Sequence, residues 1–116
     1  MGVSVVKVVH NKLVRDNIPE IIESCGKVCK THILDSSEYI DCLKAKLLEE
    51  SKEVVEASDL ESLIAELADV MEVITSIESF YDIDSTTVEE KRIAKGNKNG
   101  HFKDKIFLEY VIEEDK

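Results

Sequence analysis

The chain has 116 residues, of which 43% are hydrophobic and 34% are charged. This length and composition indicate one folded domain over residues 1–116 and exclude a disordered chain. Fifteen basic residues stand against 25 acidic ones, a net charge of −10. This balance argues against a nucleic-acid polymer as a partner, because binding a phosphate backbone requires a basic surface.

No apolar run reaches the roughly 18 residues that a membrane-spanning helix needs, and the N-terminus lacks the apolar core of a signal peptide. We therefore expect no membrane association and a cytoplasmic location. The three cysteines are an odd number, which disfavours a disulfide framework. Cys25, Cys29 and Cys42 do not combine with His32 at the spacing of the usual zinc sites, so we expect small, partly buried residues there.

The predicted elements begin with a β-branched stretch at residues 3–9, which favours a short strand. A short helix then starts near Asn17, with Pro19 in its first turn, and should stop at Gly26. Residues 30–34 favour a second strand. The N-terminal part of the chain is thus predicted to combine one short helix with two short strands.

Two long helices are predicted next. Asp35 supplies N-cap chemistry for a helix that runs to about Ser58, and the second helix runs from Ser58 or Asp59 to about Tyr81. So short a connection makes the two helices an antiparallel hairpin.

A third helix, capped by Asp84 and Ser85, should end within residues 96–100, and residues 105–112 favour a C-terminal strand. The expected fold class is therefore all-α. We expect an antiparallel helical bundle built on the long helical hairpin, with small accessory strands near the N- and C-termini.

Acidic residues occupy positions where helical periodicity places the core. At ~100° per residue, Glu50 falls at the edge of the apolar arc of the first long helix, and Glu53 lies one turn further along the same flank. Glu66 falls inside the apolar face of the second long helix, with Asp69 on the adjoining flank. Burying a carboxylate without a partner costs free energy, so we expect these side chains to have a positively charged or hydrogen-bonding partner.

For each carboxylate alone, a salt bridge or a side chain that reaches solvent at the rim is a sufficient explanation. Together they favour metal binding, because a hairpin brings the two pairs opposite each other and its second helix contains no basic residue. Four facing carboxylates are typical of sites for Mg²⁺ or Mn²⁺. A di-iron site would need Glu-x-x-His pairs. All three histidines lie outside the long helices, at His10, His32 and His101.

The motif Glu50-x-x-Glu53, twelve intervening residues and then Glu66-x-x-Asp69 resembles the signature of the all-α nucleoside triphosphate pyrophosphohydrolases. This is the superfamily of MazG and the phosphoribosyl-ATP pyrophosphohydrolases. Residues 11–22 (NKLVRDNIPEII) and the glycine-containing stretch after Lys91 also resemble its small single-domain members. In those relatives a compact Arg-Gly-Gly-Phe-like turn is usual, whereas here residues 97–99 separate the two glycines.

The resemblance implies hydrolysis of the α–β phosphoanhydride of a nucleotide, which releases pyrophosphate and a nucleoside monophosphate. The substrate would be a noncanonical nucleotide in a house-cleaning reaction, or phosphoribosyl-ATP. Mg²⁺ or Mn²⁺ would be the cofactor, while a nearby carboxylate accepts the proton of water. The implied metal ligands and catalytic residues are Glu50, Glu53, Glu66 and Asp69, with Glu49 as an accessory carboxylate.

Basic residues are candidates for binding the substrate phosphates. Lys12 and Arg15 lie in the N-terminal motif, where anchoring of the N-terminal segment is an equal alternative. Four more recur at near-helical spacing in the third helix, where cations near the C-terminus also favour the helix dipole. These four are Lys91, Arg92, Lys95 and Lys98.

The apolar face of the second long helix spans about 180°, wider than the roughly 100° that one neighbouring helix covers. An exposed apolar face of this size predicts a homodimer or a higher homo-oligomer, which the resemblance also implies. Some of four apolar residues on this helix are expected to face water in a monomer, namely Leu63, Val70, Ile74 and Ile77.

The alternative function is that of a non-catalytic helical module, which binds a nucleotide or a protein partner on the same scaffold. The four acidic positions favour the enzyme, because a scaffold needs none of them.

Overall fold

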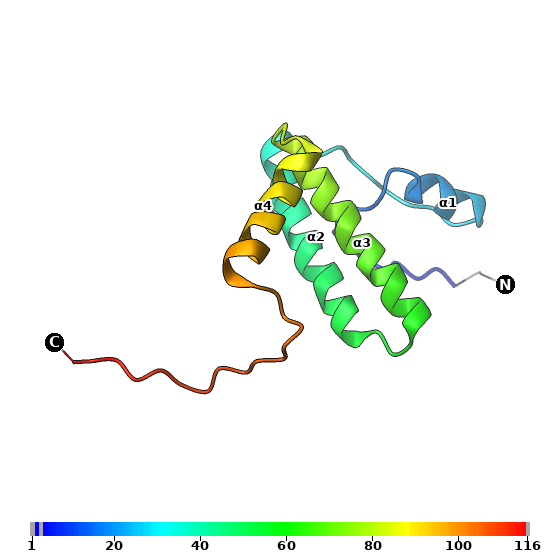
Figure 1. Ribbon diagram of the computed structural model, residues 1–116. Coiled ribbons are helices and arrows are strands. Elements are labelled where there is room, and N and C mark those ends of the chain that lie inside the picture. Colours follow the sequence, from blue (N-terminus) through cyan, green and yellow to red (C-terminus); the bar gives the residue numbers. More distant parts are fainter. Residues whose placement is uncertain (1, 3, 116) are drawn as a thin grey trace. The chain divides into compact units, whose positions relative to one another are not determined.

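Aspartate side chains start the three long helices of the chain. In the computed structural model, which describes residue 2 and residues 4–115, each of these carboxylates accepts a hydrogen bond of 2.7–2.9 Å from a backbone N–H of the first turn. Such a cap satisfies a donor that the helix itself leaves free. Asp35 starts α2 (Ser36–Glu56), Asp59 starts α3 (Leu60–Phe80) and Asp84 starts α4 (Ser85–Asn99) (Figure 1).

The short helix α1 (Ile18–Ser24) precedes them. Pro19 lies in its first turn, where the missing N–H has no intrahelical partner to lose. Asn17 makes no side-chain cap. Gly26 follows the helix with φ 81°, in the left-handed region that favours glycine. The described part of the chain is all-α, as the sequence predicts.

Helices α2 and α3 lie side by side and run in opposite directions (Figure 1). Tyr39, near the start of α2, meets Phe80, at the end of α3, with ring centroids 5.9 Å apart in an edge-to-face arrangement. Only residues 57–59 separate the two helices. The turn is therefore as short as the sequence predicts.

The helix pair buries few side chains. Among the described residues, Leu43 of α2 and Val73 of α3 are the buried apolar ones, with 3% and 7% of their surface exposed. The side chains that the sequence places toward water are half-buried at three positions (Leu63, Val70 and Ile77), and Ile74 is exposed. A longer apolar row on α3 is exposed instead. This row consists of Leu60, Ile64, Leu67, Met71 and Ile74.

The predicted accessory strands do not form in the described residues. Residues 4–9, 30–34 and 105–112 are neither helical nor paired as strands, and Val3 of the first predicted strand lies outside the described residues. The prediction was wrong because β-branched and aromatic residues stabilise a strand only when a neighbouring strand supplies hydrogen bonds and cover. Ile33 and Phe107 have no such cover, since they are 96% and 87% exposed.

The chain forms two compact units, the first ending at Asp82 and the second beginning at Ile83. The first unit contains α1, α2 and α3. The second contains α4 and the segment that follows it, and there Gly96 leaves room for the imidazole of His101, since a Cβ would overlap with the ring. No helix in the described ranges is both long and apolar enough to cross a membrane.

Candidate metal centre

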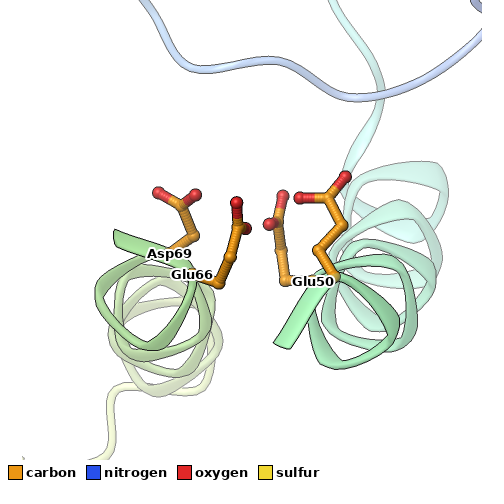
Figure 2. A group of neighbouring side chains, drawn as sticks. Glu50, Glu66 and Asp69 are labelled. Atoms are coloured by element: carbon orange, nitrogen blue, oxygen red, sulfur yellow. The ribbon is translucent and has the colours of Figure 1, made fainter. Parts of the chain in front are cut away.

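Two pairs of carboxylates meet where α2 and α3 face each other. Glu50 and Glu53 lie one turn apart on α2, and Glu66 and Asp69 lie one turn apart on α3. One oxygen from each of the four carboxylates lies within 4.8 Å of the others. In Figure 2, Glu50 extends from one helix beside Glu66 and Asp69 of the other. The structure therefore brings together all four residues that the sequence singles out, here called the acidic quartet.

Part of the acidic quartet is removed from water. Glu50 is only 7% exposed. One buried oxygen of Glu50 and one of Glu66, the Oε2 atoms, have no hydrogen-bond partner. A buried polar atom without a partner is costly. These two oxygens are therefore in the state expected of ligand atoms whose partner is a bound ion.

Positive side chains balance the acidic quartet only in part. The Lys46 Nζ lies 3.5 Å from Glu50 Oε1, and an Arg15 guanidinium nitrogen lies 2.7 Å from Asp69 Oδ1. Glu53 and Glu66 have no ion pair with any described residue. Two cations thus contact two of the four carboxylates, which leaves a formal charge of −2 when all four are ionised. At an effective dielectric constant of about 20, two unit charges about 5 Å apart repel by roughly 3 kcal/mol.

Burial and the neighbouring carboxylate of Glu53 act on Glu50 in the same direction. Burial raises the pKa of Glu50, the nearby Glu53 raises it further, and the Lys46 ammonium lowers it in part. The pKa of Glu49, the preceding residue, is shifted in the opposite direction. Its hydrogen bond from Lys12, at 3.1 Å, together with the charge of Lys46, lowers the pKa of that carboxyl.

The acidic quartet suits a hard divalent cation. Its donors are all carboxylate oxygens, which Mg²⁺ and Mn²⁺ prefer. Opposite ligands of Mg²⁺ lie about 4 Å apart, so small rotations of the side chains would close the 4.8 Å span. Among the described residues, this is the one group of three or more metal-ligating side chains. Within the part of the chain that the structure describes, the cysteines and histidines form no such group.

No protein-family model, curated protein or solved structure matches this chain.

The predicted phosphate-binding residues lie in two places. Lys12 and Arg15 contact carboxylates at the acidic quartet and beside it, through Glu49 and Asp69. The others are exposed on α4 in the second unit, where Arg92 forms an ion pair with Glu89 of the same helix. The residues on α4 are Lys91, Arg92, Lys95 and Lys98.

Lys46 is a site residue that the sequence did not distinguish from the other two lysines of α2, Lys44 and Lys52. Its side chain is only 17% exposed, and it lies within 3.5 Å of both Glu49 and Glu50. The i,i+3 and i,i+4 spacings were the available signal, because they place these three residues together on a helix. That signal is weak, since three lysines on α2 have acidic residues at similar spacings.

We expect Glu50→Gln to stabilise the metal-free protein by about 1 kcal/mol at pH 8, a typical size for one substitution. Because the pKa of Glu50 is raised, its contribution to stability is present below the ordinary glutamate pKa and is lost as the pH rises through the folded-state value. The neutral amide avoids that loss. Urea unfolding in EDTA should therefore show the gain at pH 8 and little gain at pH 4.5. Glu56→Gln, an exposed position on α2, is the control of equal charge change. Equal effects of the two variants at pH 8 would contradict the expectation.

Proposed function

We propose that this chain is a Mg²⁺-dependent nucleoside triphosphate pyrophosphohydrolase, which releases pyrophosphate and a nucleoside monophosphate. The observation that supports this most is the acidic quartet, with its unpartnered buried oxygens and its incompletely balanced charge. The resemblance of the quartet's spacing to the all-α pyrophosphohydrolases gives the reaction class. Mn²⁺ is the alternative cofactor.

The chemistry assigns separate tasks to the residues of the site. Glu50, Glu53, Glu66 and Asp69 would hold the cation, which supplies Lewis acidity and charge neutralisation when bound. A carboxylate in the same place is suited to accept the proton of the attacking water. Glu49, already balanced by Lys12 and Lys46, would hold Lys46 in position rather than bind the cation directly.

Basic residues would bind the phosphates of the nucleotide. Lys12 and Arg15 already lie at the acidic quartet or next to it, so a polyphosphate bound there would be within their reach. Lys91, Arg92 and Lys95 on α4 are proposed as further phosphate ligands, because ammonium and guanidinium groups suit phosphate oxygens.

The exposed apolar row on α3 supports assembly as a homodimer or a larger homo-oligomer. Its members follow each other at steps of four, three, four and three residues, the spacing of a helix seam that packs against another helix. A cytoplasmic location is proposed as well, because all three cysteines are free thiols.

The function is tested by incubating the protein with a panel of nucleotides and Mg²⁺. The panel contains the common ribo- and deoxyribonucleoside triphosphates, noncanonical triphosphates and phosphoribosyl-ATP. We expect pyrophosphate and a nucleoside monophosphate in equal amounts from at least one of them, and no product in EDTA. Release of orthophosphate and a diphosphate instead would contradict cleavage at the α–β bond.

The absence of cleavage of every nucleotide in the panel would favour the alternative function. If no nucleotide is cleaved but one raises the melting temperature in a Mg²⁺-dependent manner, the chain is a non-catalytic nucleotide-binding module. The same scaffold then serves a different function, and the enzyme proposal is wrong.

A further inference from the structure

The N-terminal segment crosses the open side of the acidic quartet. Arg15 reaches Asp69, 54 residues away in the chain, through a 2.7 Å hydrogen bond, and Lys12 reaches Glu49, 37 residues away, at 3.1 Å. Figure 2 shows a segment of the blue N-terminal part passing over the side toward which the carboxylates point. Between the two basic residues, Leu13 and Val14 are half-buried, so their apolar side chains are partly shielded from water.

Arg15 is hydrogen-bonded to a carboxylate that a metal ion in the acidic quartet would use. Asp69 belongs to the acidic quartet, and its Oδ1 atom already accepts the guanidinium hydrogen bond. A carboxylate oxygen in this bond offers less electron density to a cation, and two positive charges at one oxygen repel each other. Lys12 differs, because its partner Glu49 is outside the quartet.

Arg15 is also free to leave. Its side chain is 56% exposed and that of Asp69 is 37% exposed, and ion pairs at such exposure are weak. The guanidinium therefore gives up only a weak ion pair when it turns to solvent. Lys46, by contrast, is only 17% exposed beside Glu50, so its charge is a fixed part of the site.

We propose that Arg15 is a place-holding cation, which neutralises Asp69 in the metal-free protein and is displaced from it when a divalent cation binds the acidic quartet. This inference rests on the proposed metal site and adds its regulation. Displacement frees the guanidinium on the side where a polyphosphate would bind. Arg15 would then pair with Asp69 in the metal-free protein and with a phosphate group in the metal-bound protein. Metal binding would thus also make a phosphate ligand available for the nucleotide.

The first test compares Mn²⁺ affinities of charge-matched variants by electron paramagnetic resonance at 0.15 M NaCl, without nucleotide. Arg15→Gln should bind Mn²⁺ roughly two- to fivefold tighter than the wild type, the range set by exposed ion pairs. Lys12→Gln removes the same charge from the same segment, but it frees no ligand and should change the affinity less. Equal affinities of the two variants would overturn the place-holding role.

The second test observes the guanidinium itself. The chain contains only two arginines, Arg15 and Arg92, so the arginine Nε–H region of a ¹⁵N NMR spectrum holds two signals. Arg92 pairs with Glu89 within α4 and is the internal control. Saturating Mg²⁺ should make the Arg15 Nε–H group more mobile and faster in hydrogen exchange, without a change at Arg92. An Arg15 group that stays equally ordered in the Mg²⁺-loaded protein would overturn the proposal.

Failure of the proposed metal site and failure of the proposed Arg15 displacement give different results. If the wild type binds neither Mn²⁺ nor Mg²⁺, the metal site is wrong and the place-holding role is wrong with it. If the wild type binds both ions while Arg15 stays on Asp69, the metal site stands and only the displacement is wrong.

Discussion

Replacing Glu53 with alanine should lower pyrophosphate release by at least about 100-fold and remove detectable Mn²⁺ binding. Loss of a group that acts in the chemical step typically costs this much or more. Glu53 is the sharpest position to change, because it contributes to the acidic quartet and has no ion pair with any described residue. Its removal therefore leaves no cation without a partner, and it relieves repulsion on Glu50.

Matched controls separate a ligand from a surface carboxylate. Glu56 lies three residues beyond Glu53 on α2, and Glu72 lies three residues beyond Asp69 on α3; both are exposed and outside the quartet. Glu56→Ala and Glu72→Ala should retain activity, whereas Asp69→Ala should lose it as Glu53→Ala does. Circular dichroism should show unchanged helix content in all four variants. Activity of the Glu53 and Asp69 variants that persists in EDTA would show that no metal site operates here.

The second large effect concerns assembly. We expect the wild type to scatter light as a particle of at least twice the 13.1 kDa chain mass, with a melting temperature that rises with protein concentration. The physical reason is the apolar row of α3, since Ile64 is 60% exposed and Met71 is 69% exposed while so few apolar side chains are buried within the chain. Soluble monomers rarely leave such a continuous patch in water.

One pair of substitutions tests the apolar row. Ile64→Glu places a charge in the row and should dissociate the assembly, lowering the melting temperature and removing its concentration dependence. Ala65→Glu adds the same charge at the next position, which is exposed and turned by ~100° from the row. It should leave the assembly intact. A 13.1 kDa wild-type particle at micromolar concentration, with a melt independent of concentration, would contradict the prediction.

Local rules predicted the helices well. The cap positions were recognisable to within one residue, because a Ser or Asp before a helix-forming run satisfies a free backbone donor whatever the rest of the chain does. The structure has Asp35, Asp59 and Asp84 at these positions. The meeting of the acidic quartet followed from the same kind of rule. Spacings of three residues put each pair on one helix face, and a three-residue connection forces the helices together.

Contacts between distant segments were outside the reach of these rules. The pairing of Arg15 with Asp69 joins residues 54 positions apart, and no periodicity relates an irregular segment to a helix. The strand expected at residues 105–112 failed for a related reason, because a strand exists only with a partner strand. The half-buried state of Leu63 and Val70 depends on the rotation of α3 against α2, which side-chain packing sets and hydropathy alone does not.

The short connection between α2 and α3 also determines when the negative charges meet during folding. Twelve residues separate Glu53 from Glu66, so closing this loop costs little chain entropy and precedes contacts between more distant segments. We therefore expect the carboxylates to approach each other early in folding. We also expect their repulsion to slow the folding of the metal-free chain more than it speeds unfolding.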